Sequence, residues 1–132
     1  MRTSLVMTTL RVLTWGFIVL LAVLSLLPVR AFAALSLLPA IKMVRSVVPA
    51  PVGHFLAYAA AGALAMMVYA QSRGAMQIIG GYWIYAAILE YLQHFSPGRY
   101  PSIVGFIGSA LGALCGGLSV VLFWRRRRDQ LR

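Results

Sequence analysis

Acidic residues are nearly absent from this chain of 132 residues. It has 2 aspartate or glutamate residues against 12 lysine or arginine residues, which gives a formal net charge of +10. Glu90 is the only side-chain carboxylate before Asp129. Before Asp129, a reaction that needs two carboxylates, or a divalent cation held between two of them, therefore has only one carboxylate available.

Cysteine is scarce as well, since Cys115 is the only one. One thiol can form neither an intrachain disulfide nor a metal site with a second cysteine. The sequence also lacks the short motifs that bind nucleotides, haem or zinc. Three side chains of suitable type, His54, Glu90 and His94, have no recognised ligand spacing. We therefore expect no metal and no cofactor.

Apolar residues, by contrast, are in excess. They make up 61% of the chain and charged residues only 11%, a balance that leaves more apolar surface than a soluble domain of this length can bury. The basic residues lie at the ends and between apolar runs, which is typical of membrane flanks rather than of a nucleic-acid-binding face. The composition predicts a small integral membrane protein and no nucleic-acid partner.

Four apolar runs are each close to the roughly 20 residues that a helix needs to cross the hydrocarbon core of a bilayer. Backbone groups in lipid must be hydrogen-bonded within the segment, so we expect helices. The predicted fold is all-α, a polytopic four-transmembrane-helix bundle that forms a single domain over residues 1–132. Its helices cover residues 12–28, 54–70, 75–95 and 103–124, with an outer loop at 30–53 and a basic cytoplasmic tail at 125–132.

The four consecutive arginine residues at 125–128 favour a cytoplasmic C-terminus, because cytoplasmic flanks are enriched in lysine and arginine. Four spans then place the N-terminus in the cytoplasm too, with eight basic residues inside and four outside. Arg2 and Arg11, an apolar run and Ala31-Phe32-Ala33 also resemble a secretory signal, whose cleavage after Ala33 would leave three spans. The run is long for a signal, so we expect an uncleaved anchor.

The longest connection, residues 30–53, mixes Lys42 and Arg45 with aliphatic residues. Such a mixture fits an amphipathic segment that lies on the outer membrane surface. A partly ordered loop fits the sequence equally well.

The end of the third apolar run carries the strongest local signal. Glu90 and Gln93 are three residues apart and Glu90 and His94 four apart, so one helical face carries all three. Pro97-Gly98 then predicts a turn that brings Arg99 back as a counter-charge for Glu90. A carboxylate at the end of an apolar run is costly and indicates a partner or a function.

Two motifs in this order, His54-Phe55-Leu56-Ala57-Tyr58 and Glu90-x-x-Gln93-x-Phe95-x-Pro97-Gly98-Arg99, resemble the VanZ-like family of small membrane proteins. The resemblance extends over residues 12–118 and includes the Leu-Ser-Leu-Leu-Pro end of the first run, Ser102 and the glycines of the last run. It implies a bacterial inner-membrane protein of the cell envelope, in a family with a member associated with resistance to the glycopeptide teicoplanin. The family's biochemical activity is unsettled.

The chain departs from the family pattern at several positions. An Asp-Lys pair is common where Ala50 and Pro51 stand, and Asp and Asn are common where Gly105 and Ser109 stand. Two carboxylates are thus missing from the site that the pattern would build. This depletion weakens schemes in which Glu90 works with a second acid.

The predicted topology gathers the motif residues at the outer leaflet, where they can meet lipid head groups. The expected ligand-binding residues are His54, Tyr58, Glu90, Gln93, Arg99 and Ser102. We expect recognition of a membrane lipid or a lipid-linked cell-wall precursor through its phosphate, with an effect on teicoplanin-type susceptibility. The alternative is an enzyme acting on a lipid-linked substrate, with Glu90 as acid or base and His54 as proton carrier. A transporter ranks third, because the spans contain little polar lining.

Each of these residues also has a structural interpretation. Glu90 can pair with Arg99 or His54 and lock helix ends together, and His54 is more often structural than catalytic. Gln93 is expected to make a hydrogen bond between helices, and His94 to face solvent.

Gly108, Gly112 and Gly116 recur every four residues on the last run, which allows another helix to approach closely. We expect packing within the chain, with the row Ala57, Ala61 and Ala65 as partner. A homodimer face is the alternative.

Overall fold

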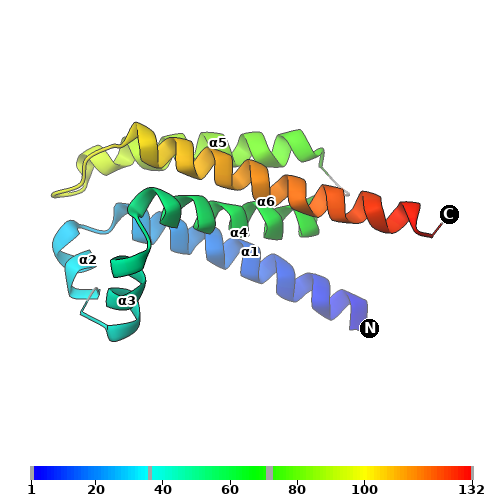
Figure 1. The fold of residues 1–132 in the computed structure, drawn as a ribbon, viewed down its shortest axis with the longest axis horizontal. Coiled ribbons are helices and arrows are strands. Elements are labelled where there is room, and N and C mark those ends of the chain that lie inside the picture. Colours follow the sequence, from blue (N-terminus) through cyan, green and yellow to red (C-terminus); the bar gives the residue numbers. More distant parts are fainter. Residues whose placement is uncertain (1, 36, 71–72, 132) are drawn as a thin grey trace.

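A computed structural model describes residues 2–35, 37–70 and 73–131, and this part of the chain is helical without a strand. Four long helices lie side by side (Figure 1). They are α1 (Arg2–Leu26), α4 (Ala50–Tyr69), α5 (Ala75–Leu92) and α6 (Ile103–Asp129). Between α1 and α4 lie two short helices, α2 (Val29–Leu35) and α3 (Pro39–Val47), and the 3₁₀ turn η1 (Gln93–Phe95) follows α5.

The four long helices alternate in direction, so the beginning of α1 and the end of α6 lie at the same end of the molecule (Figure 1). This end is termed the arginine end, after Arg125–Arg128. The opposite end, where residues 90–102 link α5 to α6, is termed the Glu90 end. Helices α2 and α3 lie beside the Glu90 end (Figure 1).

Within the described residues, three helices are long and apolar enough to cross a membrane: Ser4–Leu26, Ala50–Tyr69 and Ile103–Asp129. Their hydrophobicity is distributed almost evenly around the helix axis rather than on one face. Many large apolar side chains are exposed, among them Leu13, Val19 and Ile107. Helices that are apolar on all sides fit a lipid environment better than water. The prediction of an all-helical fold is confirmed for the described residues, and the length and composition of these three helices support a membrane protein.

Several helix bounds differ from those expected. Helix α1 begins at Arg2 rather than near residue 12, and α6 continues past Trp124 through the arginines to Asp129. Arginine is a good helix former, and cations in the last turn complement the negative end of the helix dipole. The connection at 30–53 contains α2, α3 and the first turn of α4. Its α3 is strongly amphipathic, with Met43 and Val47 exposed.

Helices α4 and α6 approach closely along the glycine row. A Cβ added to Gly108 would lie 2.8 Å from the Pro51 carbonyl oxygen. At Gly112 and Gly116 it would lie closer still, against the carbonyl oxygens of Phe55 and Ala59. Backbone approach at this distance is available only to glycine and permits Cα–H···O contacts between the helices.

The glycine row is therefore covered by α4 of the same chain. The residues opposite it are Pro51, Phe55 and Ala59, not the expected row of Ala57, Ala61 and Ala65. Ala61 and Ala65 are nevertheless buried in the core. Core residues from all four long helices include Leu21, Ala61, Met66, Ile79 and Ala113.

Candidate functional site at the Glu90 end

Glu90 lies against the start of α6. Its Oε1 accepts a hydrogen bond from the backbone N–H of Ser102, and its Oε2 is 3.5 Å from the amide nitrogen of Gln93. Ser102 is the N-cap of α6, and its hydroxyl accepts a bond from the Gly105 N–H at 3.2 Å. The first N–H groups of a helix carry a partial positive charge, so a carboxylate is stabilised there. The N-terminal end of α6 thus explains how a carboxylate is accommodated near the end of the apolar helix α5.

The segment after Glu90 docks on the C-terminal end of α1. Arg99 donates from Nε to the Leu27 carbonyl at 3.1 Å and from Nη2 to the Leu24 carbonyl at 3.0 Å. The Ser96 hydroxyl donates to the Leu26 carbonyl at 2.7 Å. Leu24 and Leu26 belong to the last turn of α1 and Leu27 directly follows it, where backbone carbonyls have no partner within the helix.

The same segment makes two further contacts with the first part of the chain. The Gln93 amide donates to the Ser25 hydroxyl at 2.8 Å, and the Val29 N–H donates to the Pro97 carbonyl at 3.3 Å. The turn at Pro97-Gly98 has the expected form, since Gly98 has φ of +77°. Residues 93–99 therefore cap the C-terminal end of α1. The hydrogen bond between helices that was expected of Gln93 is made to Ser25 of α1.

A second group of polar side chains joins α4 to α6. The Ser109 hydroxyl donates to the Gly105 carbonyl at 3.0 Å. His54 Nδ1 lies 3.3 Å from the same hydroxyl oxygen, and Tyr58 also hydrogen-bonds to Ser109. Because the Ser109 hydrogen is directed at the Gly105 carbonyl, His54 donates to Ser109 in the tautomer that carries a proton on Nδ1.

Gly105 stands between the two groups. A Cβ at this position would lie 3.4 Å from Glu90 Oε1 and 3.7 Å from Oε2, while its carbonyl accepts from Ser109. The Glu90 carboxylate, Gly105, Ser109 and His54 therefore form one continuous site, termed the Glu90 site. An acidic side chain in place of Gly105 would lie directly beside Glu90.

The Glu90 site borders a groove of about 280 Å³. Most of its lining is apolar, and Glu90, which is half-buried, supplies the charged group. The lining residues are Ala87, Glu90, Pro101, Ser102, Ile103 and Phe106. A groove of this chemistry can hold a hydrocarbon chain against Ile103 and Phe106 and a hydrogen-bond donor against the carboxylate.

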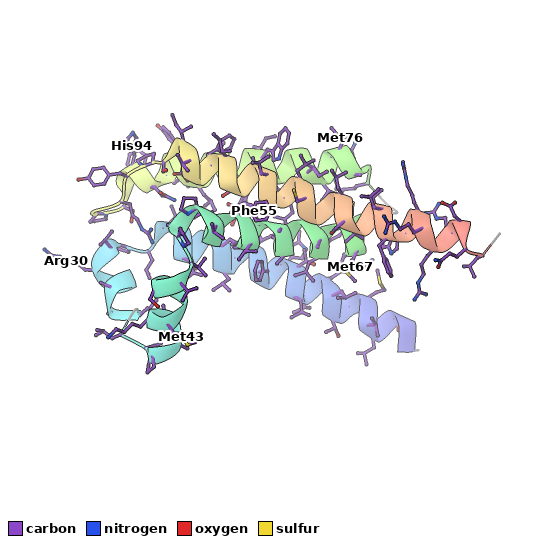
Figure 2. All side chains as sticks on the ribbon, viewed as in Figure 1. Arg30, Met43, Phe55, Met67, Met76 and His94 are labelled. Atoms are coloured by element: carbon purple, nitrogen blue, oxygen red, sulfur yellow. The ribbon has the colours of Figure 1, made fainter. Side chains whose placement is uncertain are left out.

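The six expected ligand-binding residues do not have equal access. Tyr58 and Gln93 are buried, at 5% exposure each, whereas Ser102 is exposed and His54, Glu90 and Arg99 are half-buried. His94 is exposed as expected (Figure 2), and its ring meets that of Tyr91 edge-on. Among the described residues no group of three histidine, cysteine or acidic side chains is placed to hold a metal ion.

Sequence reasoning missed Ser25 and Ser96, and it noted Ser109 only as a departure from a pattern. Single serines in apolar runs are common, so their spacing contained no signal. It also missed Tyr82 and Tyr85, whose rings lie deeper in the molecule beside that of the expected Tyr58, with ring centroids 6.3 to 6.5 Å apart. The Tyr85 hydroxyl donates to the Ile18 carbonyl of α1. The buried Tyr82 hydroxyl has no hydrogen-bond partner among the described residues.

Comparison with protein-family models, curated proteins and solved structures finds no match to this chain.

Proposed function

We propose that this chain is a VanZ-like, multi-pass protein of the bacterial cytoplasmic membrane, with four spans and both termini in the cytoplasm. The fourth span is α5, whose 18 residues extend roughly 27 Å at 1.5 Å per residue. It packs against α4 and α6, and the long helices alternate in direction. The concentration of arginine at one end of the molecule supports the orientation. Reporter fusions at residues 35 and 128 test it, since they must report opposite sides.

At the Glu90 end, the protein recognises a phosphate-bearing lipid or lipid-linked cell-wall precursor in the outer leaflet. The observation that carries this proposal is the groove beside Glu90, in which a half-buried carboxylate meets an apolar lining. The carboxylate accepts hydroxyl or amine donors of the head group, and the apolar wall receives the lipid chain. Arg30 on α2 (Figure 2), Lys42 on α3 and Arg99 after α5 provide positive charge for the phosphate at the same end. Through this binding the protein affects susceptibility to teicoplanin-type glycopeptides.

The placement of the motif residues supports the resemblance on which this proposal rests. His54, Glu90, Gly105 and Ser109 occupy positions that are far apart in the sequence yet adjacent in the Glu90 site. Gly105 and Ser109 stand where the family commonly has Asp and Asn. The lack of a second carboxylate beside Glu90 favours recognition over acid–base chemistry.

The test uses protein in nanodiscs incubated with envelope lipids and lipid-linked precursors, followed by native mass spectrometry. Ala87→Trp fills the groove, and Ala60→Trp, at an exposed position of α4, adds the same bulk elsewhere. We expect a discrete lipid on the wild type and on Ala60→Trp and its loss from Ala87→Trp. Equal retention by all three proteins, or no selective retention by the wild type, contradicts the proposal.

A fourth variant separates binding from catalysis. Glu90→Gln keeps an acceptor for the Ser102 N–H but cannot transfer a proton as a carboxylate does. Retention of an unchanged lipid by the wild type supports recognition, whereas conversion that stops in Glu90→Gln identifies the alternative, an enzyme. Teicoplanin susceptibility of cells expressing wild type, Ala87→Trp or Ala60→Trp then links the groove to the phenotype.

A further inference from the structure

A cavity of about 600 Å³ is lined by residues of the arginine end. This end lies opposite the Glu90 end (Figure 1). The cavity is formed by the end of α4, the beginning of α5 and the last turns of α6. Its lining residues are Ala70, Ala75, Val121, Trp124, Arg125, Arg127, Arg128 and Leu131. Among the described residues, the lining combines three cations with apolar side chains and contains no acidic residue.

We propose that this cavity binds one anionic glycerophospholipid of the cytoplasmic leaflet, with the phosphate among the arginines and the glycerol and upper acyl chains on the apolar part. The charge of the lining selects an anion, and an arginine guanidinium forms paired hydrogen bonds with phosphate oxygens. Val121, Ala75 and Leu131 offer the apolar surface that a free phosphate ion would not use. These two features together favour a lipid over a soluble anion.

The arrangement on α6 gives the site a defined geometry. Val121, Trp124, Arg125 and Arg128 follow the spacing of one helical face, so the cations stand directly above the apolar residues. The Arg127 guanidinium lies 5.6 Å from the centre of the Phe123 ring, which restrains it by a cation–π contact. Trp124 is half-buried, at the level where interfacial tryptophans meet head groups.

Helix α5 adds a second source of positive potential. Ala75 is its first residue and lines the cavity, and the N-cap Gly74 provides no side-chain hydrogen bond. The N-terminal N–H groups of a helix attract phosphate oxygens. The anion site therefore draws on two helices and not on the arginine run alone.

Arg126 provides a matched control, because it belongs to the same run but does not line the cavity. Arg125→Ala and Arg126→Ala each remove one positive charge and leave three arginines for membrane topology. The experiment compares wild type and these variants in phosphatidylcholine nanodiscs containing phosphatidylglycerol, by native mass spectrometry. We expect preferential retention of one phosphatidylglycerol by wild type and Arg126→Ala, and a decrease of about fivefold in Arg125→Ala.

A second variant, Ala75→Phe, fills the cavity without a change in charge, and it also must reduce retention. Equal losses in Arg125→Ala and Arg126→Ala would show that only the charge of the run matters and would overturn the proposal. It is overturned as well if the wild type shows no preference over phosphatidylcholine, or if Ala75→Phe binds like wild type. In an Ala87→Trp background, the difference between Arg125→Ala and Arg126→Ala must persist, so failure of this proposal is distinguishable from failure at the Glu90 groove.

Discussion

The Glu90 carboxylate accepts a hydrogen bond from the backbone N–H of Ser102, 12 residues later in the chain. This contact joins the end of α5 to the beginning of α6 and gives the carboxylate the positive end of a helix dipole as its surroundings. Glu90 thus has a structural role whatever it binds. Glu90 also lines the groove, so its carboxylate remains the feature on which ligand recognition depends.

Substitutions of Glu90 separate the contribution of its negative charge to stability from the contribution of its hydrogen-bond acceptor. Glu90→Gln keeps an oxygen for the Ser102 N–H and loses only the charge–dipole term, about 0.3–1 kcal/mol. Glu90→Ala leaves that N–H without a side-chain partner and costs about 1–3 kcal/mol. We expect the unfolding temperature in detergent to decrease from wild type to Glu90→Gln and further to Glu90→Ala. Equal unfolding temperatures for Gln and Ala would show that the Ser102 bond contributes nothing.

Arg99 stabilises the end of α1. Arg99→Ala removes the donors to the Leu24 and Leu27 carbonyls, and we expect a loss of about 1–3 kcal/mol together with faster hydrogen exchange in the last turn of α1. Arg30→Ala removes an exposed arginine at the same end and serves as the control. If Arg30→Ala has the same effect on exchange, the loss reflects net charge rather than the cap.

The glycine row has no room for a side chain at the α4–α6 interface. A Cβ at Gly112 would collide with the Phe55 carbonyl, so Gly112→Ala should cost about 1–3 kcal/mol, and Gly112→Leu should reduce the yield of folded protein. Gly81→Ala is the control, because nothing lies within 4 Å of a Cβ added there. Normal folding of Gly112→Leu, measured by size-exclusion profile and thermal stability, would contradict this packing.

Tyr82 and Tyr85, both on α5, should respond in opposite ways to loss of their hydroxyl groups. Tyr85→Phe removes a hydrogen bond to the Ile18 carbonyl and should destabilise the protein by about 1 kcal/mol. Tyr82→Phe removes a buried hydroxyl that has no partner among the described residues, so stability should stay equal or increase. Unfolding in detergent measures both. Destabilisation by Tyr82→Phe of the same size as Tyr85→Phe would reveal a polar partner for Tyr82.

Several local features could be predicted because they depend on neighbouring residues. Helix α1 ends just before Pro28, and the turn at Pro97-Gly98 contains a glycine at positive φ. The glycine row was expected to pack within the chain, and α4 covers it. The arginines at 125–128 were read as a tail after the helix, whereas they continue it, because flanking charges mark a membrane boundary and not a helix end.

By itself, the sequence determined that this protein is helical and suited to a membrane, because hydropathy and helix punctuation are local properties. Only the tertiary structure decided the partners of the polar residues. Glu90 meets a backbone N–H of α6, and Arg99 and Ser96 meet carbonyls of α1 about 70 residues earlier. Polar groups at helix ends accept whichever partners the packing of distant segments brings near. Spacing along the chain does not encode that choice.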